Sequence, residues 1–157
     1  MNKFWKALLS TALLVGTTDI LAATLMSWAR SGNFPFKLFH YIAGGALGLE
    51  RSMKGSWGTA LLGLSFHYFI AFSFTLLFFL AFPRLSFLRG NAYLTGFLYG
   101  VFVGACMTFM VLPLTALPPN PFKLFNALQG WTVLGLVLGI PIALMAKRYY
   151  LNKLTEL

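Results

Sequence analysis

The chain has 157 residues, of which 59% are hydrophobic and only 10% are charged. Soluble domains carry about 25% charged residues, so this composition, with a mean hydropathy of +0.78, excludes an ordinary soluble domain and indicates a membrane protein. The net charge of +9 comes from basic residues at the ends of apolar runs, where they meet anionic lipid, and we expect no nucleic-acid partner.

The first apolar segment covers residues 7–29, which is long enough to cross a bilayer as a helix. Its basic start and the small residues Ala22 and Ala23 also fit a secretory signal peptide. The apolar run continues past these residues to Trp28, however, and Asp19 is unusual so close to a cleavage site. We therefore interpret the segment as a membrane span with a carboxylate near its middle.

The connection after this span contains a shorter apolar stretch at residues 35–48. Ser31, Gly32 and Asn33 are turn formers that should end the first helix. Pro35 suits the first turn of a new helix, but the stretch is too short to span the membrane. Its apolar residues share one face, which predicts a helix lying at the membrane interface.

Three more apolar segments are long enough to span, at residues 57–82, 92–112 and 125–146. Pro113 closes the third span, and the prolines within residues 115–123 predict a stiff extended loop. Pro141 lies inside the fourth span, where it is tolerated if a neighbouring helix satisfies the carbonyl that it frees. We predict an all-α, polytopic membrane protein, a single domain of four spanning helices in a bundle plus one interfacial helix.

The distribution of Lys and Arg favours both termini on the cytoplasmic side. This orientation puts seven of the 12 basic residues inside, namely Lys3, Lys6, Arg84, Arg89, Lys147, Arg148 and Lys153. The other five then lie outside, namely Arg30, Lys37, Arg51, Lys54 and Lys123.

Rows of small residues predict how the spans associate, because lipid gives apolar helices no hydrophobic reason to pack together. The rows consist of Gly96, Gly100, Gly104 and Thr108 in the third span and of Gly135 and Gly139 in the fourth. We expect these two spans to pack closely. A second copy of the chain stays open as another partner for the groove that the first row forms.

Two ionisable side chains, Asp19 and His67, lie within spans on small-residue faces. At a rise of 1.5 Å per residue, each is about 18–22 Å from the inner end of its helix, so the two are level to within a turn. A charge at the bilayer centre costs at least about 2.5–3.5 kcal/mol, so each group needs a partner or a neutral form. We expect them to meet, either as an ion pair or as a protonated carboxyl bonded to a neutral imidazole.

Other kinds of site find little support in the residues. The single cysteine, Cys106, excludes an internal disulfide and a multi-cysteine metal site. Small bundles use histidines as haem ligands, but His40 lies outside the spans, which argues against haem held by His40 and His67. The three acidic residues are too far apart for a two-carboxylate site: Asp19, Glu50 and Glu156. We expect no enzyme, no metal and no cofactor.

Short motifs along the chain resemble a set of small, uncharacterised bacterial four-helix membrane proteins. The motifs are Gly16-Thr17-Thr18-Asp19-Ile20, His67 with Ile70-Ala71-Phe72, Phe82-Pro83-Arg84, Gly96 with Tyr99-Gly100, and Leu112-Pro113-Leu114 with Pro118-Pro119. Through these motifs, the chain is distantly similar to the YagU-like inner-membrane family. The resemblance implies a bacterial inner-membrane location and a four-helix fold, and it carries over no catalytic or binding residue.

Two classes of function follow from these features. The first is a small transport or proton-linked protein, acting as an oligomer, with Asp19 and His67 at its polar core. The second is a structural or accessory subunit of a larger membrane complex, in which the Asp19–His67 bridge fixes helix register and the Gly96–Gly104 groove docks a partner. A membrane enzyme acting on lipids is a third class, but no nucleophile–base pair is visible.

Overall fold

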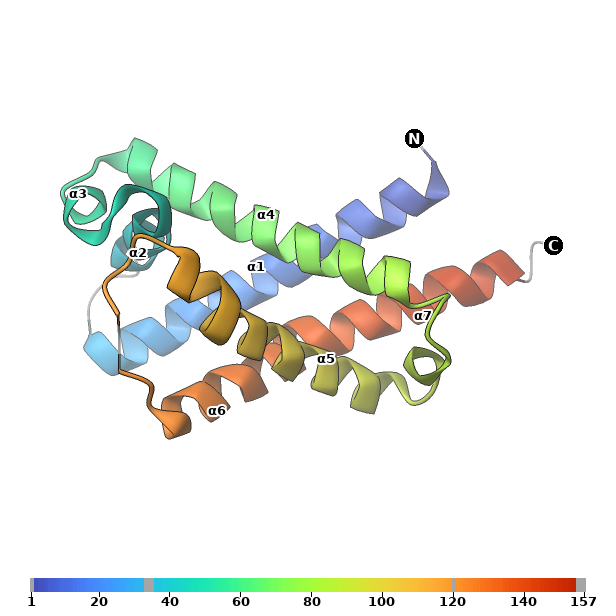
Figure 1. The fold of residues 1–157 in the computed structure, drawn as a ribbon. Coiled ribbons are helices and arrows are strands. Elements are labelled where there is room, and N and C mark those ends of the chain that lie inside the picture. The colour runs from blue at the N-terminus through green and yellow to red at the C-terminus, as the bar shows by residue number, and fades with distance from the viewer. Residues whose placement is uncertain (1, 33–35, 120, 155–157) are drawn as a thin grey trace.

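A computed structural model of the protein describes residues 2–32, 36–119 and 121–154. Within these residues the chain forms helices and connecting loops, and it forms no β-strand. Four helical segments are long and apolar enough to cross a membrane: Lys3–Ala29, Trp57–Ala81, Ala92–Leu114 and Leu124–Asn152. The chain is therefore a multi-pass membrane protein, and the prediction of an all-α bundle with four spans is confirmed (Figure 1).

The first half of the chain contains two spans and three shorter helical elements. They are α1 (Lys3–Ser31), α2 (Phe36–Leu47), α3 (Leu49–Met53), α4 (Trp57–Ala81) and the 3₁₀ turn η1 (Ser86–Arg89). Helix α1 begins earlier than residues 7–29 predict because the Asn2 side chain accepts a hydrogen bond from the Phe4 N–H at 3.3 Å. Gly32 ends it with φ at 64°, a left-handed conformation that glycine adopts readily. The predicted helix start at Pro35 lies outside the described residues.

The second half contains two spans that change from α-helical to π-helical geometry just before a proline. The third span consists of α5 (Ala92–Cys106), the π-helical turn η2 (Met107–Val111) and the 3₁₀ turn η3 (Leu112–Leu114). The fourth consists of α6 (Leu124–Leu134), the π-helical turn η4 (Gly135–Gly139) and α7 (Ile140–Leu154). Each π-helical turn ends two residues before Pro113 or Pro141. Because proline has no N–H for the carbonyl four residues earlier, the helix widens locally.

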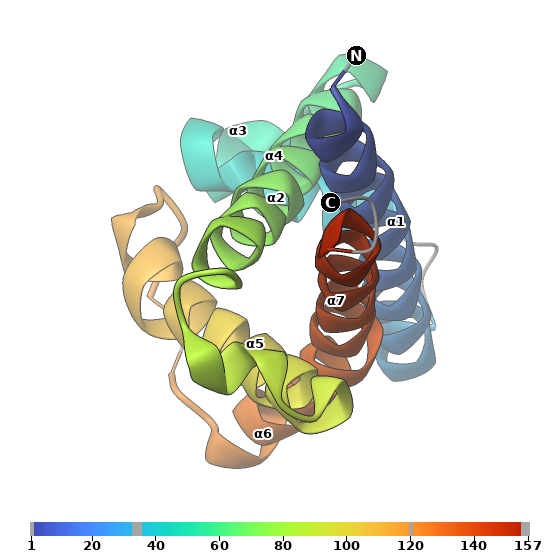
Figure 2. The same ribbon diagram turned by 90° about the vertical axis from the view of Figure 1, so that its right-hand side faces the viewer.

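The two termini lie at the same end of the bundle, together with the connection from α4 to α5 (Figure 1). Helices α2 and α3 and the loop between η3 and α6 lie at the opposite end. Helix α1 contacts both α4 and α7, and α5 packs along α6, η4 and α7 (Figure 2). The last span therefore joins the α1–α4 pair to α5.

Aromatic side chains form much of the core near the termini. Phe78 and Phe79 are fully buried, and Tyr99 stacks edge-on against Phe78 with ring centroids 4.7 Å apart. The Tyr99 hydroxyl donates a hydrogen bond to the Phe74 carbonyl at 2.6 Å, and the Tyr150 hydroxyl donates to the Phe79 carbonyl at 2.7 Å. These bonds tie α5 and α7 to α4, because both carbonyls belong to that helix.

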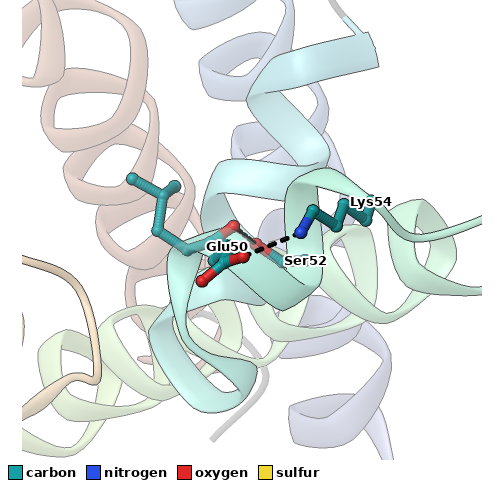
Figure 3. A network of polar contacts seen from close by, with 4 residues as sticks. Glu50, Ser52 and Lys54 are labelled. Atoms are coloured by element: carbon teal, nitrogen blue, oxygen red, sulfur yellow. Dashed lines mark hydrogen bonds and ion pairs between the residues drawn. The ribbon is translucent and has the colours of Figure 1, made fainter.

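The short helix α3 adds to the elements that the sequence predicts, and it turns the chain from α2 back toward α4. Its buried Ser52 hydroxyl donates a hydrogen bond to the Leu49 carbonyl at 3.0 Å, while Glu50 and Lys54 form an exposed ion pair of 2.7 Å (Figure 3). Helix α2 packs against α4 at Gly63, where an added Cβ would collide with the Phe39 carbonyl.

Candidate functional site

The interface between α1 and α4 brings polar groups together at the middle of two spans. Gly16 makes this contact close, because a Cβ at that position would lie 2.8 Å from Cδ1 of Tyr68 and 3.4 Å from the Ala71 Cβ. The ring of Tyr68 occupies the space that a larger residue at position 16 would need. The small residue therefore sets the distance between the two helices.

His67 reaches across this interface to the backbone of α1. Its Nε2 lies 2.8 Å from the Gly16 carbonyl oxygen. A carbonyl can only accept a hydrogen bond, so Nε2 carries the hydrogen and donates it. Nδ1 is then the ring nitrogen that carries no hydrogen in the neutral imidazole.

Asp19 lies three residues after Gly16 on α1 and is half-buried. It is close enough to His67 for the two charges to interact, so the structure brings both predicted polar-core residues to one height on neighbouring helices. Among the described residues, no group donates a hydrogen bond to its carboxylate. The expected direct bond between Asp19 and His67 is thus not formed, and the imidazole bonds through Nε2 to the Gly16 carbonyl.

A pair of hydroxyl groups flanks the site. Thr17 Oγ1 and the Tyr68 hydroxyl lie 2.8 Å apart and share a hydrogen bond between α1 and α4. This pair was not predicted from the sequence. A signal was present, since Tyr68 is the one tyrosine within residues 57–82.

Thr18 connects the same turn of α1 to the last span. Pro141 has no N–H to offer the Val137 carbonyl, and the Thr18 hydroxyl lies 3.0 Å from that oxygen. It also lies 3.1 Å from the Leu14 and Val15 carbonyls of its own helix, so its single hydrogen serves one acceptor at a time. A neighbouring helix thus offers a donor to the carbonyl that the proline frees.

The predicted rows of small residues face one another across the third and fourth spans. A Cβ on Gly96 would lie 2.6 Å from the Gly139 carbonyl oxygen, and one on Gly100 would collide with the backbone at Gly135. At Gly104 the space is filled by the ring of Trp131.

Thr108 continues this row by a polar contact instead. Its hydroxyl donates to the Gly104 carbonyl at 2.8 Å and accepts from the indole Nε1 of Trp131 at 3.2 Å. The groove along α5 is therefore filled by α6, η4 and α7 of the same chain.

Metal or haem ligands are not gathered anywhere in the described part of the chain. No group of three His, Cys, Asp or Glu residues there could hold a metal ion. The two ring nitrogens of His40 lie 2.9 Å from the Phe36 carbonyl and 3.2 Å from the Gly55 carbonyl, so neither nitrogen points to a shared site with His67. Cys106 is a free, half-buried thiol.

Comparison of the chain with protein-family models, with curated proteins and with solved structures finds no match. The resemblance to the YagU-like family therefore stays a prediction, and the arguments about function rest on the geometry around Asp19 and His67.

Proposed function

We propose that this chain is a small proton-linked membrane protein whose polar centre is formed by Asp19 and His67. The observation that carries the proposal is the Asp19 carboxylate, which lies in mid-span near the His67 imidazole and accepts no hydrogen bond from the described residues. A bridge that served only to hold two helices together would use both groups in hydrogen bonds, since a carboxylate without donors is costly in a low-dielectric interior. Ionisable groups that persist at such a depth mark proton or ion paths.

The chemistry of the pair follows from the Gly16 contact. With Nε2–H held by the carbonyl, Nδ1 of His67 is the atom that would take a proton from the Asp19 carboxyl, relayed by a water because the two side chains do not bond directly, and the reverse transfer regenerates the neutral pair. The transfer leaves the total charge of the pair unchanged. A second proton that binds Asp19 makes the pair cationic, and its release on the other side would complete one passage.

The test is proton movement in vesicles that contain the purified protein. A membrane potential is imposed and the internal pH is followed with a trapped dye, for the wild type and for Asp19→Asn and His67→Gln. Both variants should fall to the level of protein-free vesicles, while Ser65→Ala should match the wild type because the Ser65 hydroxyl bonds only to the Leu61 carbonyl of its own helix. Size-exclusion profiles and melting temperatures verify that each variant is folded.

Either of two results would overturn the proposal: wild-type vesicles no more permeable to protons than empty ones, or folded variants with wild-type flux. The alternative is a structural or accessory subunit of a larger membrane complex. Such a subunit would need a docking face other than the Gly96–Gly104 row, which α6, η4 and α7 fill. Inactive vesicles together with a stable complex in native membranes would favour it.

We also propose that the protein lies in a bacterial inner membrane with both termini in the cytoplasm. The shared position of the termini and the α4–α5 connection supports this (Figure 1). The segments that carry basic residues there are the first turns of α1 with Lys6, the α4–α5 connection with Arg84 and Arg89, and α7 with Lys147. A fluorescent protein fused to the C-terminus should fold and emit, and a fused periplasmic phosphatase should be inactive.

A further inference from the structure

A groove of about 640 Å³ lies at the end of the bundle opposite the termini. Its walls are α2, the last turns of the third span, the proline-containing loop and the start of α6. Most of the lining is apolar, with prolines and the rings of Phe109 and Phe122. The polar lining residues are Tyr41, Thr108, Lys123 and Asn126.

The walls of this groove are fixed by contacts within the chain. The Ala116 N–H donates a hydrogen bond to the Gly45 carbonyl of α2 at 2.9 Å. Leu117 packs on Gly44 so closely that a Cβ there would lie 3.0 Å from its Cδ2. These two contacts hold the start of the loop against α2.

Among the described residues, the charged side chain that lines the groove is basic. Lys123 is its charged lining residue, and no acidic side chain lines it among the described residues. Of the described carboxylates, Asp19 lies in mid-span and Glu50 is paired with Lys54 at 2.7 Å. Lys123 therefore has no carboxylate of this chain to neutralise it within the described residues.

The start of α6 adds hydrogen-bond donors next to this ammonium. The first intrahelical bond runs from the Ala127 N–H to the Lys123 carbonyl, so the N–H groups of Leu124, Phe125 and Asn126 precede the helical ladder. The N-cap residue Lys123 makes no capping hydrogen bond to them with its side chain. Together with Lys123, they favour an anion at the mouth of the groove.

We propose that this groove binds an anionic phospholipid, with its phosphate at Lys123 and the start of α6 and an acyl chain along the prolines and phenylalanines. The apolar walls favour a lipid over a free phosphate ion, which would leave them unfilled. A glycerol headgroup fits better than a choline or ethanolamine headgroup, because none of the described residues that line the groove is acidic and could pair with an ammonium. The site is independent of Asp19 and His67.

The test uses the full-length protein in detergent, stripped of lipid. Phosphatidylglycerol and phosphatidylcholine with identical acyl chains are titrated, and bound lipid is counted by native mass spectrometry. Phosphatidylglycerol should bind more tightly, and Lys123→Gln should weaken it about fivefold while leaving phosphatidylcholine unchanged. Lys37→Gln is the matched control, because Lys37 is an exposed lysine of α2 that does not line the groove.

A second variant tests the apolar part of the site. Ala127→Phe places a ring in the groove and should weaken both lipids, while the melting temperature of the lipid-free protein shows whether the variant is folded. Equal binding of the two lipids by the wild type would overturn the proposal, as would equal losses in Lys123→Gln and Lys37→Gln. Displacement of the lipid by millimolar inorganic phosphate would also overturn it in favour of a simple anion site.

Discussion

The two main interfaces of the bundle join helices in different ways. Between α1 and α4, side chains reach across: His67 donates to the Gly16 carbonyl, and Thr17 meets Tyr68. Between α5 and the last span, backbone lies directly on backbone at Gly96, Gly100, Gly135 and Gly139. The α1–α4 interface is crossed by several side-chain hydrogen bonds, whereas the second interface is closest where glycines leave the two backbones in contact.

The two interfaces therefore have different roles: the contact between α5 and the last span stabilises the bundle, and the α1–α4 contact holds the ionisable groups. Close backbone contact gains dispersion energy over a long seam and needs no polar group, so it can hold the bundle together. The α1–α4 interface contributes fewer close backbone contacts but holds a carboxylate and an imidazole where charge is expensive. We therefore expect two kinds of effect. Substitutions in the glycine seam, defined as Gly96, Gly100, Gly135 and Gly139, should affect folding, and substitutions around Asp19 should affect activity.

The largest effect should come from a methyl group in the glycine seam. Gly100→Ala places a Cβ against the backbone of Gly135 and Leu134, where no flexible side chain can move aside. We expect it to lower the free energy of unfolding by about 3 kcal/mol. Gly130→Ala is the matched control on the opposite span, since a Cβ there meets nothing within 4 Å. The control should gain up to about 1 kcal/mol, because alanine is the better helix former.

Unfolding in mixed micelles with increasing denaturing detergent measures both variants. Gly100→Ala should lower the free energy of unfolding, and Gly130→Ala should raise it. Equal small losses at the two positions would mean that the seam at Gly100 is not closely packed.

Most of the fold could be predicted because its signals are local to single segments. The length of each apolar run identifies the four spans, and the spacing of Gly96, Gly100 and Gly104 by one helical turn identifies a packing face. Helix α3 could not be predicted, because a five-residue helix carries no periodic pattern.

The site was only partly predictable, for a different physical reason. Asp19 and His67 stand out as ionisable residues in spans, and their depth follows from the helical rise. The partner of His67 is a backbone carbonyl, however, and every residue has one, so no sequence pattern marks Gly16 as the acceptor. Likewise, Pro141 reveals that Val137 lacks its usual donor, but only the rotation of α1 determines that Thr18 approaches it.

A smaller effect on the free energy of unfolding is expected from a substitution at Thr18, where α1 contacts the last span. Thr18→Val removes the hydroxyl that reaches the Val137 carbonyl and should lower the free energy of unfolding by about 1 kcal/mol. Thr132→Val is the matched control, since the Thr132 hydroxyl donates only to the Leu128 carbonyl of its own helix. The control should change the free energy of unfolding by less than half as much.

A double-mutant cycle identifies the cause of that loss. Pro141→Ala restores an N–H for the Val137 carbonyl, so Thr18→Val should cost clearly less in this background. An equal cost in both backgrounds would show that Thr18 stabilises the protein only through its own helix, at the Leu14 and Val15 carbonyls.

The smallest effect should follow from Tyr68→Phe, which keeps the ring that packs on Gly16 and removes only the hydroxyl that meets Thr17. We expect a loss of about 0.5 kcal/mol in the free energy of unfolding, since hydrogen bonds between spans are weak on average. Tyr93→Phe, at an exposed tyrosine of α5, should cost nothing measurable. Proton flux should stay near the wild-type rate, because the hydroxyl pair joins α1 to α4 and neither hydroxyl bonds to Asp19 or His67 among the described residues. If flux fell as far as in Asp19→Asn, the proton path would have to include Tyr68, and the polar centre would extend one residue beyond the Asp19–His67 pair.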